Sequence, residues 1–262
     1  MMKLSYETLL SPTPIKLSVG TIRKPTLREI SELTFNEFDA FKFFLKLTPK
    51  RYYKTILNAE DKWDSMSDDE KSNITLYKCI MESKQLQETY SLLLNFFFIE
   101  DVIYDDGIFI ITNDVNDKSK ICGALFAERF DIILLYLQQI CMIYEEPKKE
   151  EAPILKNSLA RKLYEKIQKA EEEKKAREDQ KMASKLALGN IISSVSNYHK
   201  TINPINVWDL TLFQLYDTFK RMQINDSYEM NKTSVSVYGD EKKKFDPTLW
   251  YEDINKENQD VQ

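Results

Sequence analysis

The chain has 262 residues, a mass of 30.9 kDa and a formal net charge of −5 at pH 7. That length fits one large domain or two ordinary ones. With 42% hydrophobic and 12% aromatic residues it can build a sizeable core, which excludes wholesale disorder. A pI near 5.3 gives no general attraction to nucleic acid or anionic lipid, and only five glycines disfavour a turn-rich all-β sandwich.

The cysteines and the start of the chain indicate a soluble intracellular protein. Cys79, Cys122 and Cys141 are odd in number and far apart, and we expect each to lie in a helix as a small buried hydrophobe in a reducing cytosol. The first residues lack the apolar stretch of a signal peptide. Apolar runs also fall short of the roughly 18 residues that a membrane span requires.

The first fifty residues predict a short hairpin followed by a helical stretch. Residues 14–19 alternate apolar and polar side chains, Gly20 supplies a turn, and residues 21–23 can return. Pro25 suits the first turn of a helix, because its missing N–H costs nothing there. Apolar residues then recur at helical spacing from Leu27 to Leu47, which predicts a core-facing stretch.

Two helix signals and a hairpin signal follow. Residues 52–58 read as helical, and Ser67 with Glu70 has the spacing of a capping box that opens a helix through Met81. Residues 84–98 continue as a buried helical pattern. Residues 102–111 form the clearest hairpin, since the Asp-Gly dipeptide at 106–107 tolerates the positive φ values of a tight turn.

A long apolar helix over 119–144 closes the N-terminal part of the prediction, and a compositional break follows. Residues 145–153 are charged and punctuated by proline, which marks a linker. Leucine or isoleucine then recurs every four residues from Leu155 to Ile167, followed by interleaved Lys and Glu to about Lys181. This segment predicts a solvent-exposed helix that bridges two lobes or pairs with a partner.

The last eighty residues predict a second helical lobe. Apolar spacing returns from Leu186 to Val195, and residues 207–222 read as one strongly amphipathic helix rich in aromatic side chains. Residues 233–240 suggest a short strand and turn, and residues 245–254 form a final aromatic patch. The predicted fold is therefore mainly α with small β hairpins (α+β), with two helical lobes joined by a charged helix. Its divisions are 1–145, 146–182 and 183–262.

Enzymatic and metal-binding patterns are weak. The single histidine, His199, has no second group at a metal-ligand or acid–base spacing. The five glycines form no phosphate loop. Carboxylate clusters at 68–70, 105–106 and 114–117 are better explained as a helix start, a hairpin turn and a polar loop. We therefore expect no enzyme, no cofactor, no metal site and no catalytic residues.

Protein binding is the remaining functional class. A nucleic-acid platform around Tyr216 and Phe219 with Lys220 and Arg221 is disfavoured by the acidic residues on the same helix. For residues 208–222 burial in a core is the leading interpretation, whereas the terminal patch either straps onto the core or inserts into a partner. The candidate partner-binding residues are Trp208, Phe213, Tyr216, Phe219, Phe245, Leu249, Trp250 and Tyr251.

Three stretches carry a resemblance to a known family. They are Pro14-Ile15 leading to Lys24-Pro25-Thr26-Leu27-Arg28-Glu29-Ile30, the segment from Trp208 to Phe219, and Trp250 after Gly239-Asp240. Together they resemble bacteriophage or prophage tail assembly chaperone-like proteins of Gram-positive hosts. The resemblance implies a non-enzymatic assembly factor in the host cytoplasm that binds tape-measure or tail-tube protein, without nucleic acid or membrane.

Two other classes stay open beside this one. A structural virion component, such as a connector, tail or baseplate subunit, would locate to the virion instead of the host cytoplasm. A DNA-associated or enzymatic phage protein is disfavoured by the acidic charge and the missing motifs. The sequence leaves partner identity and self-association into an oligomer open.

Overall fold

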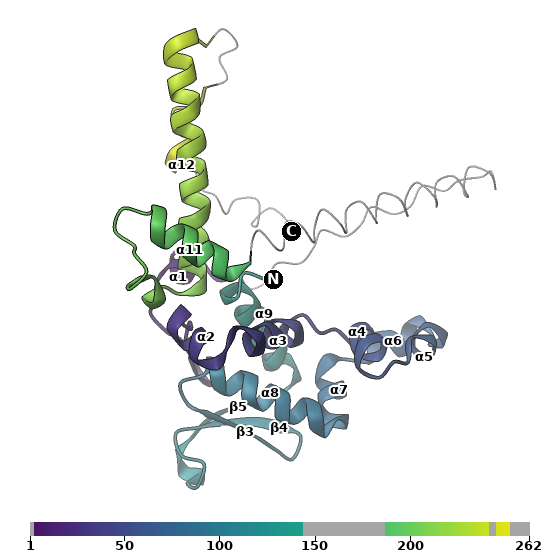
Figure 1. The fold of residues 1–262 in the computed structure, drawn as a ribbon. Helices are drawn as coiled ribbons and strands as arrows, with labels where there is room; N and C mark the ends of the chain where they lie inside the picture. Colours follow the sequence, from purple (N-terminus) through teal and green to yellow (C-terminus); the bar gives the residue numbers. More distant parts are fainter. Residues whose placement is uncertain (1–2, 144–186, 241–244, 252–262) are drawn as a thin grey trace, which may run out of the picture. The chain divides into compact units, whose positions relative to one another are not determined.

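A computed structural model describes residues 3–143, 187–240 and 245–251 (Figure 1). The chain divides into two compact units. The first unit holds described residues 3–143 together with 208–214, and the second holds 187–207, 215–240 and 245–251. The sequence-based division assigned residues 208–214 to the C-terminal lobe. The charged segment 146–182 lies outside the described residues, so its predicted helix and the three-part division stay predictions.

The first unit consists of short helices around two small antiparallel sheets. Its helices are α1 (Tyr6–Leu10), α2 (Leu27–Leu33), α3 (Phe35–Leu45), α4 (Pro49–Arg51), a π-helical turn η1 (Tyr52–Ile56), α5 (Glu60–Ser65), α6 (Asp68–Asn73), α7 (Leu76–Glu82), α8 (Lys84–Phe97), the 3₁₀ turn η2 (Lys118–Lys120) and α9 (Ala127–Ile140). Its strands are β1 (Ile15–Leu17), β2 (Gly20–Ile22), β3 (Asp101–Asp105), β4 (Ile108–Thr112) and β5 (Ile121–Leu125). The prediction of a mainly α fold with small β hairpins is confirmed.

The predicted N-terminal hairpin is confirmed, and the helical stretch after it is divided. Strands β1 and β2 pair antiparallel, with Leu17 opposite Gly20, so the turn lies at residues 18–19. The stretch from Leu27 to Leu47 breaks at Thr34, whose φ of 84° is incompatible with a continuous helix. Its side chain accepts a hydrogen bond from the Glu37 amide at 3.3 Å and starts α3.

The predicted capping box at Ser67 is confirmed, but its helix is shorter than expected. The Glu70 amide donates to the Ser67 hydroxyl at 3.2 Å, and the Ser67 amide donates to the Glu70 carboxylate at 2.8 Å. Helix α6 ends at Asn73, and Thr75 caps a separate helix, α7, by accepting from the Lys78 amide. The prediction of one helix through Met81 was therefore wrong, because a second N-cap restarts the chain at Thr75.

The central hairpin is confirmed and gains a third strand. Strands β3 and β4 pair around Asp106 and Gly107, which have φ values of 43° and 83°. Strand β5 pairs antiparallel with β4, so the prediction of one helix over 119–144 was wrong. Gly123 in β5 lies against Val19, where a Cβ would come within 2.6 Å of the Val19 Cα. Residues 121–125 therefore form a strand that pairs with β4 and packs against Val19, and α9 begins only at Ala127.

Aromatic and aliphatic side chains fill the space between the helices and the three-stranded sheet. Tyr90, Phe97, Phe109 and Phe130 are fully buried, and the rings of Phe109 and Phe130 stack with centroids 5.6 Å apart. Helix α8 packs on β3 and α9 packs on β5, which places both helices over one face of the sheet (Figure 1). This layer is the hydrophobic core of the first unit.

The predicted burial of the cysteines is confirmed at two of three positions, and the predicted helical location is confirmed only at Cys79. Cys79 in α7 and Cys141 after α9 are buried, and burial raises the pKa of their thiols to about 11 and about 12. Cys122 is only half-buried and lies in β5, not in a helix. Thiols with such raised pKa values carry little thiolate at neutral pH, which fits two structural, unreactive cysteines.

The second unit is helical. It contains α11 (Leu188–Tyr198), most of α12 (Leu212–Tyr238) and the 3₁₀ turn η4 (Leu249–Tyr251), and the turn η3 (Val207–Asp209) begins in it. Two predictions were wrong here. Residues 233–240 do not form a strand, since α12 continues to Tyr238, and residues 207–222 are not one helix, since η3 and α12 are separated at Leu210 and Thr211.

Among the described residues, none of the helices combines the length and the apolar character that crossing a lipid bilayer requires.

Candidate partner-binding surface

Residues 208–214 belong to the first unit, where backbone contacts hold them. The Leu27 amide donates to the Leu210 carbonyl at 2.8 Å, and Thr26 and Thr211 form an isolated antiparallel bridge. Arg28 Nη2 lies 2.8 Å from Asp209 Oδ1, and this hydrogen bond raises the pKa of Arg28. The segment is therefore seated on the start of α2, which explains why the helix predicted from residue 207 is interrupted.

Both helices that begin at this bridge carry the same cap. The Thr26 amide donates to Glu29 Oε2 at 2.7 Å, and the Thr211 amide donates to Gln214 Oε1 at 2.9 Å. In return each Thr hydroxyl accepts from the backbone amide three residues later, at 3.3 Å in both cases. These are two capping boxes, and they show that the two motifs noted in the sequence meet at one place.

The predicted aromatic site residues between 208 and 219 divide into one buried and three half-buried side chains. Phe213 is buried, with its ring centroid 6.0 Å from that of Tyr6 in the same unit. Trp208 is half-buried in η3, and Tyr216 and Phe219 are half-buried in α12. Phe213 thus supports the packing of the first unit. Partner contact at these four positions stays a prediction.

The terminal patch packs on the distal half of α12 within the second unit. The Phe245 ring lies 5.6 Å from the Tyr228 ring, at an interplanar angle of 32°. The Phe245 amide donates to Asp240 Oδ2 at 3.0 Å. The Thr248 amide and hydroxyl donate to Asp246 Oδ1 at 2.8 and 2.7 Å and lower the pKa of Asp246, so this turn carries a negative charge at neutral pH.

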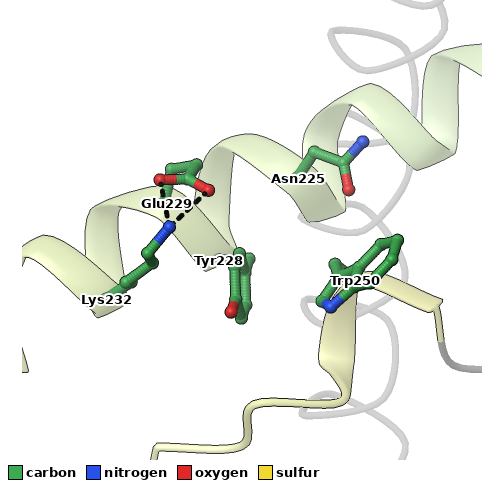
Figure 2. Close-up of a pocket in the computed structure, with 5 residues that line it drawn as sticks. All are labelled: Asn225, Tyr228, Glu229, Lys232 and Trp250. Atoms are coloured by element: carbon green, nitrogen blue, oxygen red, sulfur yellow. Dashed lines mark hydrogen bonds and ion pairs between the residues drawn. The ribbon is translucent and has the colours of Figure 1, made fainter.

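A shallow, open hollow lies beside this contact (Figure 2). It has a volume of about 440 Å³ and is lined by Asn225, Tyr228, Glu229, Lys232 and Trp250. Figure 2 shows the Trp250 ring opposite the α12 side chains, with the Lys232 ammonium bonded to the Glu229 carboxylate at 3.3 Å. Lys232 Nζ also lies 5.7 Å from the Tyr228 ring centroid.

A second hollow of about 350 Å³ shares Tyr228 with the first. It is lined by Tyr228, Asn231, Ser234, Val235, Asp240, Phe245, Asp246 and Leu249. Phe245 and Leu249 are half-buried, whereas Trp250 is 50% exposed and Tyr251 is 57% exposed. Four of the predicted site residues thus lie together beside α12, namely Phe245, Leu249, Trp250 and Tyr251. The rings of Trp250 and Tyr251 are exposed to solvent.

The α12 residues of this surface were not predicted from the sequence. Asn225, Glu229 and Lys232 recur at spacings of four and three, which places them on one helix face with Tyr228. Beyond Ile224 the sequence becomes polar. The spacing of these α12 residues was the available signal, but a pattern within one helix does not tell which other segment will cover it.

Within the described ranges, no three His, Cys, Asp or Glu side chains are grouped so that they could hold a metal ion. His199 lies at the end of α11, and its Nδ1 accepts backbone N–H bonds from Thr201 at 3.3 Å and Ile202 at 3.2 Å. Its ring therefore caps a turn.

One comparison with known families finds a match. Residues 175–255, less than a third of the chain, match the model of a family described as YomV second domain. This range includes α11, α12 and the terminal aromatic patch. The match suggests a phage- or prophage-related protein and carries no information about tail assembly. Comparison with curated proteins and with solved structures finds no significant match.

Proposed function

We propose that this chain is a non-enzymatic phage morphogenesis protein, a tail assembly chaperone that binds tape-measure or tail-tube protein through α12 and the terminal aromatic patch. Two independent lines support the proposal. The matched family range, which suggests a phage-related protein, covers this surface. The resemblance of residues 14–30, 208–219 and 250 implies an assembly role. Such a protein would act in the host cytoplasm.

The observation that carries the proposal is the exposure of Trp250 and Tyr251. Their rings lie 4.9 Å apart beside an open hollow on α12, while the ring of Phe245 holds the segment to Tyr228. Large aromatic side chains that a partner can bury dominate the energetics of protein interfaces. An anchored turn that presents two such rings is suited to contact an apolar segment of another protein.

The test is capture of purified tape-measure or tail-tube protein by the full chain. Trp250→Glu should weaken capture by at least tenfold, because a carboxylate would enter the desolvated centre of the contact. Met230→Glu is the matched control. At 100° per residue, Met230 lies on the side of α12 away from Asn225 and Lys232, and it is 66% exposed. Capture that Trp250→Glu leaves unchanged would overturn the proposal.

The amount of this protein in purified particles separates the proposal from its structural alternative. A chaperone should be absent from mature virions, whereas a connector, tail or baseplate subunit should be present in a defined copy number. Quantitative mass spectrometry of purified particles makes this distinction. A defined stoichiometry near that of known tail components would replace the chaperone with a structural virion component.

A further inference from the structure

The three-stranded sheet of the first unit carries apolar side chains on both of its faces. The face covered by α8 and α9 holds Val102, Phe109, Ile111 and Leu125, all essentially inaccessible to solvent. Figure 1 shows these helices on one side of β3, β4 and β5, and no described element on the other. One face of the sheet is therefore part of the hydrophobic core. We call the opposite face, which no described element covers, the open face.

The open face is also apolar. Strand register places Ile103, Ile110 and Ala124 side by side across β3, β4 and β5, and side chains alternate between the two faces of a strand. All three are only half-buried, and Ile121 at the start of β5 is 46% exposed. An antiparallel sheet with one face in water normally alternates apolar and polar residues, whereas strands covered on both faces read as apolar runs. Strands β4 and β5 have the pattern of strands that are covered on both faces.

At the β3 edge of the sheet, a side chain caps the backbone groups of Val102. In the pairing of β3 with β4, the N–H and C=O of Val102 point away from β4. The Val102 amide donates to Asn95 Oδ1 at 2.8 Å, and Asn95 Nδ2 donates to the Val102 carbonyl at 2.6 Å. The Asn95 side chain thus takes the place of a neighbouring strand at Val102, which disfavours addition of a strand at the β3 edge.

The area of the open face of β3, β4 and β5 limits the kind of partner that it can bind. Three strands of five residues span roughly 14 by 17 Å, or about 240 Å², whereas a stable protein dimer buries about 800 Å² on each partner. A second copy of this chain packed face to face would bury only this area and would also bring its own Asp101 and Asp105 carboxylates onto the same small acidic face. A single α-helix is about 10 Å wide, and a length of about 17 Å corresponds to roughly eleven residues. One amphipathic helix fits the face.

The acidic side chains on the open face indicate which side chains flank the apolar stripe of that helix. Asp101 and Asp105 lie two residues on either side of Ile103, on the same open face, and both are exposed. Neither carboxylate forms an ion pair with the described residues. We propose that the open face of β3, β4 and β5 binds an amphipathic helix of a partner protein, with Ile103 and Ile110 against its apolar stripe and basic side chains beside Asp101 and Asp105. This site lies in the first unit and is independent of the proposed α12 surface.

The test uses two synthetic fourteen-residue helical peptides with the same leucine stripe, one flanked by Lys and the other by Glu. Fluorescence anisotropy with the full chain should show binding of the Lys-flanked peptide at least tenfold tighter than that of the Glu-flanked peptide. Ile110→Glu should reduce this binding by at least tenfold. Leu92→Glu, on α8 and 66% exposed, should leave it unchanged.

A charge-reversed variant keeps the test decisive if Ile110→Glu fails to fold. Asp101→Lys with Asp105→Lys changes exposed side chains only and should reverse the preference toward the Glu-flanked peptide. Equal binding of both peptides by this variant, or binding that survives Ile110→Glu in a folded protein, would overturn the proposal. A concentration-dependent dimer that Ile110→Glu abolishes would also overturn it, since the face would then serve a second copy.

Discussion

Each of the two units holds a cluster of aromatic rings, and the clusters differ in what surrounds them. In the first unit, Tyr77, Tyr90, Phe109 and Phe130 form a connected group with centroid distances of 5.3 to 6.4 Å. In the second, Tyr228 meets Phe245, and Trp250 meets Tyr251. The first group is buried, whereas the last two rings are half exposed or more.

The polar atoms of the two clusters follow the same division. The Tyr77 hydroxyl contacts the carbonyls of Gly107 at 2.8 Å and Leu125 at 2.9 Å, and the Tyr90 hydroxyl donates to the Phe44 carbonyl at 2.8 Å. Burial raises the pKa of Tyr77 and Tyr90. Aromatic content therefore says little about role by itself. What decides the role is whether the rings and their hydroxyls are enclosed by the same unit.

The largest expected effect comes from the centre of the buried cluster. Phe130→Ala removes a ring that stacks on Phe109 and meets Tyr77 and Tyr90, and we expect it to cost about 3–5 kcal/mol of unfolding free energy. Urea unfolding of the full chain, followed by circular dichroism, measures it. Phe126→Ala, four residues earlier and 54% exposed, is the matched control and should cost below about 1 kcal/mol. Equal losses would show that burial does not decide how much an aromatic ring contributes to stability.

A smaller effect should follow from removing a buried hydroxyl. Tyr77→Phe keeps the ring but leaves the Gly107 and Leu125 carbonyls without this donor, which should cost about 1–3 kcal/mol. The same urea titration measures the change. Tyr251→Phe, which removes an exposed hydroxyl, should be neutral. A neutral Tyr77→Phe would mean that water replaces the hydroxyl and that the cluster is less enclosed than its burial indicates.

The contact between Phe245 and Tyr228 should contribute less than either of these two. An aromatic pair contributes about 0.5–1.5 kcal/mol beyond the area it buries, so Phe245→Ala should release the terminal patch without unfolding α12. The indole N–H resonance of Trp250 should then move toward that of a free peptide, while the helical circular dichroism is kept. An unchanged Trp250 resonance would show that Asp240 and the Asp246 turn suffice to hold the patch.

Local signals predicted much of the fold. The capping box at Ser67 and the Asp-Gly hairpin at 106–107 are each specified by a few adjacent residues, because each depends on neighbouring backbone groups. The Thr-x-x-Gln signal at 211–214 was equally local, and it marks the true start of α12. Strand β5 was missed because its conformation depends on β4 and on the close approach of Val19 to Gly123.

The candidate site was predictable only in part for the same reason. The terminal aromatic residues stand out in the sequence because they lie outside a periodic segment. Their partners on α12, Asn225, Tyr228 and Lys232, do not, since the contact joins residues about twenty positions apart. The backbone hydrogen bond from Leu27 to Leu210 joins residues more than 180 positions apart. A pattern within one segment contains no information about such a contact.

The smallest expected effect on stability is at the residue on which the proposed function depends most. Trp250→Ala removes a ring that is half exposed at the rim of an open hollow, so the free energy of unfolding should change by about 0.5 kcal/mol or less. The same variant should lose at least tenfold in capture of tail protein, because a ring that contributes little to its own unit is free to be buried by a partner. Parallel measurement of urea unfolding and capture gives both numbers on one preparation. A loss of stability comparable to that of Phe130→Ala would place Trp250 with the buried cluster and remove the distinction between the two units.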